Sequence, residues 1–188
     1  IYVRFGDNEA MMACGRPRNT KSQTYSPDIA EELRAAARLR GPGWFLAHCG
    51  GSSRRGLPVS FRYPRRSDLA GRRFAKQFDI PRPAPNVFAL NWLLFHQPDR
   101  LVRWLAGLPA PRVLIAGETI CDSRRIRAAF RDYEIVVLPD KNGFGQVLGA
   151  GLNACRRASS VVCAAGPAAR VLGAKLRLIG WPGIYLDA

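Results

Sequence analysis

Short apolar runs rich in β-branched residues alternate along this chain with longer segments whose apolar residues recur at helical spacing. Strands that alternate with helices are typical of βαβ units, whose strands form a mostly parallel sheet. We therefore expect an α/β fold, a Rossmann-like and mostly parallel sheet flanked by helices, in a single domain over residues 1–188. The predicted strands are residues 1–3, 44–48, 112–116, 134–138, 160–165 and 184–186. The predicted helices are residues 9–14, 26–40, 67–78, 86–96, 98–105, 122–130, 144–157 and 168–178.

The clearest helix start is the run Ser26-Pro27-Asp28. Serine is a preferred N-cap residue, proline suits the first helical position, and an acidic side chain in the first turn favours the helix dipole. The sequence thus predicts a helix that begins directly after Ser26 and ends before Gly41.

Length and composition limit the classes of protein to which the chain can belong. At 188 residues and 47% hydrophobic content, it can bury a full-sized core and is not of the disordered class. No apolar run reaches the length of a membrane span, and no signal peptide opens the sequence. Because Ile1 already lies in a predicted strand, we expect a further segment to precede it.

The five cysteines are scattered, odd in number and without a CxxC pair. This usage is typical of reduced thiols in a cytoplasmic protein and not of a disulfide framework or a zinc site. We therefore predict a cytoplasmic location.

The net charge is +15, and nearly all of the positive charge is arginine. One interpretation is a coding bias toward arginine that leaves an unspecific basic surface. The other is attraction to an anionic partner, which would be nucleotide phosphates, nucleic acid or an acidic membrane face. The basic, loop-rich segment 49–85 also has two interpretations. It is either a solvated loop or a segment that binds an anionic acceptor or nucleic acid. No RNP, zinc-finger or helix-turn-helix signature supports nucleic acid.

The most informative candidate site follows the first predicted strand, in the run Arg4-Phe5-Gly6-Asp7-Asn8-Glu9. In α/β proteins ligands bind at the carboxyl ends of strands, and paired carboxylates there can hold a hard divalent cation against a diphosphate. The alternative is a helix start at which Glu9 only favours the positive end of the helix dipole.

Three later strand ends carry further candidates. Gly166-Pro167 opens a helix whose free N–H groups would suit a phosphate, and Lys141-Asn142 offers a point charge and a hydrogen-bonding amide. Each is also compatible with an ordinary turn. Glu118 ends a strand too, although Glu118-Thr119 could equally begin the next helix.

Taken together, these segments resemble the GT-D-type glycosyltransferases, a bacterial family with a DxE motif. The acidic run is similar to the family's R-F/Y-G-D-G-E turn, and Gln23-Thr24-Tyr25 follows as in the family. The blocks 138–144 and 165–172 resemble its P-x-K-N-A-F and G-P-T-A-x-x-L motifs, and 180–187 its final G-x-x-A-x-D-x-G. The likeness covers residues 2–48 and 112–187, and leaves 49–111 unmatched. Two residues depart from the pattern, Asn8 in place of glycine and Ala168 in place of a small hydroxyl residue.

The resemblance implies a nucleotide-sugar donor, usually a UDP-sugar, and a divalent cation, Mn²⁺ or Mg²⁺. By position, Asp7 and Glu9 would serve the metal and the diphosphate. An acceptor hydroxyl that attacks the sugar also needs a catalytic base, and Glu118 and Asp187 are both strand-end candidates for it. The residues expected to bind the nucleotide sugar are Arg4, Gly6, Lys141, Asn142, Gly166 and Pro167.

The expected acceptor is a glycan, a glycoprotein or a lipid-linked molecule, with peripheral contact to an anionic inner membrane face as one possibility. Two alternatives stay open at this point, a basic nucleic-acid-binding module and a catalytically inactive relative.

Overall fold

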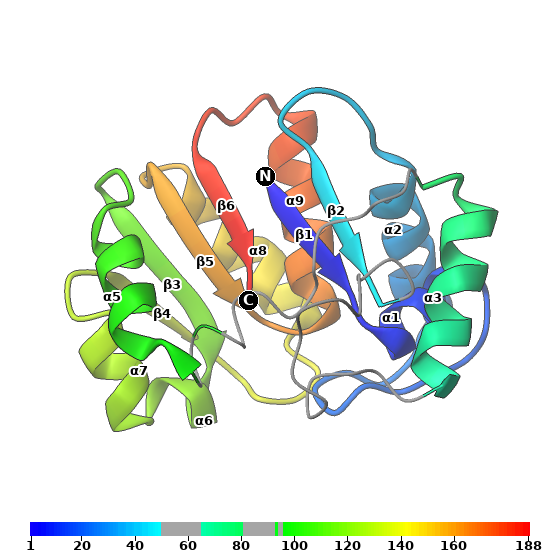
Figure 1. Ribbon diagram of the computed structural model, residues 1–188, viewed down its shortest axis with the longest axis horizontal. Helices are drawn as coiled ribbons and strands as arrows, with labels where there is room; N and C mark the ends of the chain where they lie inside the picture. Colours follow the sequence, from blue (N-terminus) through cyan, green and yellow to red (C-terminus); the bar gives the residue numbers. More distant parts are fainter. Residues whose placement is uncertain (50–64, 81–92, 94–95) are drawn as a thin grey trace.

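The computed structural model describes residues 1–49, 65–80, 93 and 96–188 of the chain. Within them, six strands form one sheet in the order β2-β1-β6-β5-β3-β4, and every neighbouring pair is parallel. The α/β class and the parallel sheet predicted from the sequence are therefore confirmed (Figure 1). The strands are β1 (Tyr2–Phe5), β2 (Phe45–His48), β3 (Arg112–Gly117), β4 (Glu134–Leu138), β5 (Ser160–Ala164) and β6 (Ile184–Asp187).

The central strands read as continuous apolar runs because helices cover both of their faces. Val113 and Ile115 of β3 belong to the larger apolar core, whereas Leu114 between them belongs to a second core on the other face. The same alternation in β5 places Val161 in the larger core and Val162 in the smaller one.

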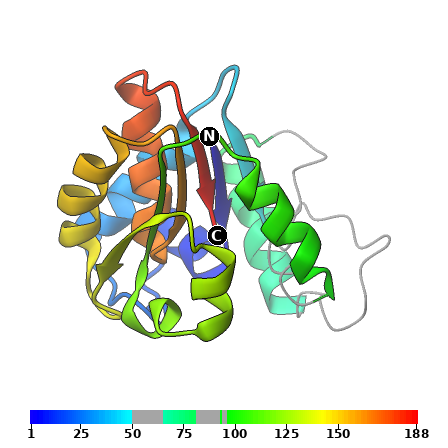
Figure 2. The same cartoon turned by 90° about the vertical axis from the view of Figure 1, so that its left-hand side faces the viewer.

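Helices lie on both sides of this sheet (Figure 2). On one side α9 packs between α2 and α8, and on the other side α5 contacts α7. The helix α3 packs against α1, and Phe74 of α3 stacks on Phe5 with ring centroids 4.7 Å apart. The bounds are α1 (Asp7–Ala13), α2 (Pro27–Arg38), α3 (Arg65–Gln77), α5 (Pro98–Ala106), α6 (Glu118–Cys121), α7 (Arg124–Ala129), α8 (Phe144–Cys155) and α9 (Pro167–Leu178).

Most predicted elements are confirmed with small shifts at their ends. Ser26 caps α2 as expected, because its side chain accepts a hydrogen bond of 3.2 Å from the backbone N–H of Ile29. Two features differ from the prediction. The first helix begins at Asp7 and not at Glu9, because Gly6 is extended and acts as the N-cap. The helix predicted at 122–130 is confirmed as α7, and a separate short helix, α6, precedes it, since the turn after β3 already becomes helical at Glu118.

The basic segment 49–85 is described in part. The helix predicted at 67–78 is confirmed as α3, whereas 50–64 and 81–85 lie outside the described residues. Of the helix predicted at 86–96, only Leu93 and His96 are described. No helix in the described ranges is both long and apolar enough to cross a bilayer.

The strand order determines which turns meet. From β1 the chain moves outward to β2, whereas from β3 it moves outward to β4 on the other side of the sheet. The later strands β5 and β6 fill the space between β3 and β1. Because all strands are parallel, the turns after β1, β3, β4 and β5 lie at one end of the sheet, the lower end in Figure 1. In open parallel sheets this end is where ligands bind.

Candidate functional site

The acidic turn after β1 leads directly into α1. Asp7 and Glu9 both lie in the first turn of this helix, and both are half-buried. Asp7 accepts a hydrogen bond of 3.0 Å from the backbone N–H of Asn8. A Cβ atom at Gly6 would lie 2.7 Å from Oε2 of Glu9, so glycine leaves room for this carboxylate to fold back over the turn.

Behind this turn, one arginine of α9 joins three parts of the chain. The Arg170 guanidinium lies 3.1 Å from Oδ2 of Asp187 and 3.6 Å from Oε1 of Glu9. It also donates hydrogen bonds to the backbone carbonyls of Arg4 and Gly166. Asp187 in turn accepts a hydrogen bond of 2.9 Å from the backbone N–H of Arg4, whose Nε lies 3.6 Å from its Oδ1. We call Arg4, Glu9, Arg170 and Asp187 the charge network.

The charge network is almost dry. The side chain of Asp187 is 0% exposed and that of Arg170 is 5% exposed, while Glu9 keeps 13% of its side chain in contact with solvent. Burial raises the pKa of the Asp187 carboxyl above its ordinary value, against the opposing effect of the two guanidinium groups beside it. Burial also acts to lower the pKa of Arg170, but the carboxylates of Asp187 and Glu9 outweigh it and the pKa lies above its ordinary value. Arg170 therefore stays charged wherever the protein is folded.

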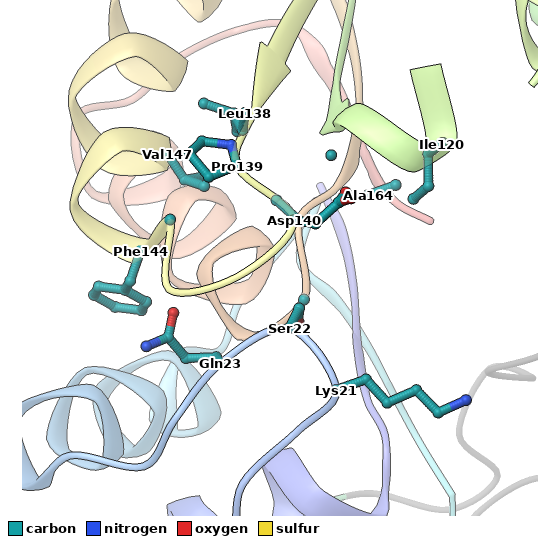
Figure 3. A pocket seen from close by; sticks show the side chains of 14 residues that line it. Lys21, Ser22, Gln23, Ile120, Leu138, Pro139, Asp140, Phe144, Val147 and Ala164 are labelled. Carbon is teal, nitrogen blue, oxygen red and sulfur yellow. The ribbon is translucent and has the colours of Figure 1, made fainter. Parts of the chain in front are cut away.

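A cavity of about 180 Å³ opens at the carboxyl ends of β3, β4 and β5 (Figure 3). Figure 3 shows it between the segment 21–23 and the loop that runs from Leu138 to Phe144. Ile120 of α6 and Ala164 of β5 border it as well. We call it the strand-end pocket.

Hydrogen bonds of Asn142 hold two walls of the strand-end pocket together. The N–H of Asn142 donates to the carbonyl of Ser22 over 2.9 Å. The side-chain oxygen of Asn142 accepts from the N–H of Thr24 at 2.9 Å and from the amide of Gln23 at 3.3 Å. Asn142 has a positive φ of 55°, a conformation that asparagine tolerates better than most residues. Its position therefore joins the loop after β4 to the polar loop before α2.

Two glycines allow further close contacts at this end of the sheet. A Cβ atom at Gly117 would lie 2.3 Å from Oδ1 of Asp140, which accepts a hydrogen bond of 3.1 Å from the backbone N–H of Thr119. Gly166 has a φ of 54°, and a Cβ atom there would lie 2.2 Å from Oγ of Ser22. Only glycine fits either position without displacement of its neighbour.

The structure places the candidate residues in two groups. Arg4, Glu9, Asp187 and the carbonyl of Gly166 meet in the charge network, and Gly6 and Asp7 belong to the turn that carries Glu9.

The second group lies toward the strand-end pocket. Gly166 lines it, Asn142 holds one of its walls, and Lys141 is exposed in the same loop. Pro167 is buried at the first position of α9, and Glu118 is exposed at the first position of α6. The roles of all these residues stay predictions.

Sequence reasoning missed Arg170 and Asp140. For Arg170 a signal was present, since α9 is otherwise apolar along 167–174, and an arginine on a buried helix face needs an acidic partner. For Asp140 no signal existed, because its partner Thr119 is 21 positions away and the run Asp-Lys-Asn-Gly is ordinary turn sequence.

The two acidic residues of the turn, Asp7 and Glu9, suit a divalent cation that is bound partly by the substrate. No group of three or more His, Cys, Asp or Glu residues able to hold a metal occurs in the part of the chain that the structure describes. Mg²⁺ and similar ions, however, are commonly bound by one or two carboxylates together with substrate phosphates and water. Asp7 and Glu9 fit this second arrangement.

Comparison with known proteins identifies the fold. The chain is similar to a solved structure described as a new glycosyltransferase from Streptococcus sanguinis with domain of unknown function 1792, at 19% identity and a TM-score of 0.69. This match covers 99% of this chain and 73% of that chain. A second structure, described as the highly conserved domain of unknown function 1792 with a distinct glycosyltransferase fold, matches at 17% identity and a TM-score of 0.66 over 99% of this chain and 70% of that chain. No protein-family model matches the sequence, and no curated protein matches it. This chain therefore has the distinct glycosyltransferase fold of those structures.

Proposed function

We propose that this protein is a metal-dependent glycosyltransferase. It would move a sugar from a nucleotide-sugar donor, a UDP-sugar, to a hydroxyl group of a glycan, glycoprotein or lipid-linked acceptor. The observation that carries the proposal is the contact between the acidic turn and the start of α9, where Arg170 lies 3.6 Å from Glu9 and also bonds the Gly166 carbonyl. The fold that the chain shares with described glycosyltransferases adds independent support.

The donor nucleotide would occupy the strand-end pocket. Its diphosphate would extend toward the start of α9, where the positive end of the dipole of a 12-residue helix favours an anion. Lys141 and Arg4 would add positive charge, so the departing nucleoside diphosphate would be met by preorganised donors.

Asp7 and Glu9 would hold Mn²⁺ or Mg²⁺ together with the diphosphate oxygens. When bound, such a cation stabilises the negative charge that develops on the leaving group. The task of Arg170 would be to keep the Glu9 carboxylate in place, since an isolated pair of close carboxylates would repel.

The two candidate bases differ in access. Asp187 is fully buried and held by Arg170 and by the N–H of Arg4, so it would position the β1 turn and would not reach an acceptor hydroxyl. Glu118 is exposed at the carboxyl end of β3 and is the better candidate for taking the acceptor's proton.

We place the enzyme in the cytoplasm, with peripheral contact to the inner membrane face as part of the same proposal. No disulfide joins the five cysteines, all of which the structure describes, and four of them are buried. Thiols without disulfides are typical of a reducing compartment. The net charge of +15 would favour an anionic membrane surface.

Calorimetric titration with UDP-sugars, with and without Mn²⁺, tests the proposal. We expect binding that depends on the cation and is lost in Asp7→Asn. The matched control is Asp28→Asn, which removes the same charge from the exposed first turn of α2 and should leave binding unchanged. Absence of any nucleotide-sugar binding, or equal binding in both variants, would contradict the proposal. Binding without any release of UDP in the presence of acceptors would indicate an inactive relative.

A further inference from the structure

A second and larger cavity lies on the other face of the sheet, between the strands and the helices α5 and α7. It measures about 540 Å³, which is in the range of small-molecule sites and well above the voids of a packed interior. We call it the apolar cavity. Its lining is dominated by Leu101, Leu105, Leu114, Ile126, Phe130 and Val162.

The ionisable side chains that line the apolar cavity, among the described residues, are both cationic. They are Arg4 of β1 and Arg125 of α7. Thr119 and Ser123 line the cavity as well, although the Thr119 hydroxyl already donates to Asp140. No carboxylate side chain lines the cavity within the described ranges. The lining therefore complements a molecule with an apolar body and an anionic head group.

The apolar cavity adjoins the strand-end pocket. Ile120 and Ala164 line both of them, so the two spaces meet at the carboxyl ends of β3 and β5. Arg4 belongs to the apolar cavity and to the charge network at once. A molecule in the apolar cavity would thus have its polar end close to a nucleotide in the strand-end pocket.

We propose that the apolar cavity binds the hydrocarbon part of a lipid-linked acceptor, whose phosphate is met by Arg4 and Arg125. This inference rests on the proposed function and narrows its acceptor to one of three classes. A hydrocarbon chain fits better than an apolar peptide segment, because buried peptide N–H and C=O groups need partners. The side chains of Thr119 and Ser123 are too few to satisfy such a backbone.

Decyl phosphate, decanol and inorganic phosphate, titrated separately below the micelle concentration, test this inference by calorimetry. Burial of the alkyl chain should make decyl phosphate bind at least about a hundredfold more tightly than inorganic phosphate. Arg125→Gln should weaken decyl phosphate about tenfold, the usual effect of losing a charged hydrogen bond. Ile126→Trp should block binding, because the larger side chain would fill the apolar cavity from α7.

The matched control is Arg124→Gln, which removes the same charge from the neighbouring exposed position outside the apolar cavity. It should leave the affinity within about twofold. Equal effects of the two arginine changes would overturn the inference, as would decanol binding as tightly as decyl phosphate. Inorganic phosphate binding as tightly as decyl phosphate would indicate a free-phosphate site and would overturn it too.

A parallel titration with UDP and Mn²⁺ separates the two proposals. UDP binding without decyl phosphate binding would overturn the lipid acceptor and leave the transferase proposal standing. Decyl phosphate binding without UDP binding would contradict the transferase and leave a lipid-phosphate site. If both hold, decyl phosphate should still bind at saturating UDP but with reduced affinity, because the two spaces share only two lining residues and Arg4 would face the anionic groups of both ligands.

Discussion

Replacing Arg170 by methionine should destabilise the protein severely. Methionine keeps much of the volume of the arginine side chain but leaves the carboxylate of Asp187, which is 0% exposed, without its closest cation. Removal of one partner from a buried ion pair costs about 3–5 kcal/mol, a large fraction of the roughly 5–15 kcal/mol that stabilises a typical domain. For a chain of this size each kcal/mol lowers Tm by about 2–4 °C, so we expect a fall of about 6–20 °C.

Urea denaturation followed by tryptophan fluorescence would measure the loss, with Lys175→Met as the control on the same helix. The Lys175 amine lies 2.9 Å from Glu32, but the two side chains are 34% and 39% exposed. Such a solvated pair contributes at most about 1 kcal/mol. Combining Arg170→Met with Asp187→Leu should restore part of the lost stability, because no unpaired buried charge then remains at position 187. A loss as small as that of the control, or no recovery in the double variant, would refute this account.

The loss of unfolding free energy caused by Arg170→Met should also depend on pH. Burial raises the pKa of Asp187, and without Arg170 that rise would be larger. A carboxyl whose pKa is raised in the folded state binds its proton more tightly there than in the unfolded chain, so lowering the pH favours the folded state. The difference in unfolding free energy between the native protein and the variant should therefore be largest near neutral pH. It should shrink as the pH falls toward the ordinary pKa of aspartate.

Two further predictions concern the strand-end pocket and the thiols. Gly166→Ala should lower the unfolding free energy by about 1–3 kcal/mol and weaken UDP binding, because φ is 54° and the new Cβ would lie 2.2 Å from Oγ of Ser22. The control is Gly180→Ala, where φ is 68° and no neighbour lies within 4 Å. It should show the cost of backbone strain alone and leave UDP binding unchanged. Burial raises the pKa of Cys155 and Cys163 to about 12. In the folded protein both thiols should therefore resist iodoacetamide at pH 8 and react only after unfolding. Modification of the folded protein at the rate of a free thiol would contradict this.

Local pattern determined most of the secondary structure. The strands β1, β3, β5 and β6 could be predicted because each is a short apolar run that ends at glycine or a polar residue. The cap at Ser26 was equally local, since the bond it makes reaches only Ile29. The start of α1 differs from the prediction by two positions, because only the extended backbone of Gly6 shows where the first turn begins.

The candidate site was predicted in part. The acidic turn and the start of α9 were each found as the end of a strand, and the carboxyl ends of parallel strands lie at one edge of the sheet. The contact between them is made by Arg170, which carries no motif of its own. The apolar cavity was not predicted, because residues that line it, such as Leu101 and Val162, are indistinguishable from ordinary core positions in the sequence.

The sequence by itself determined which segments are strands and helices and where polar side chains follow them, because these depend on neighbours a few positions apart. The tertiary structure alone decided that β6 lies beside β1, so that Asp187 meets the N–H of Arg4 across 183 positions of the chain. It also decided that Ile120 and Ala164 face two cavities at once. Periodicity reports that a side chain is buried, but strand order and helix packing determine what it is buried against.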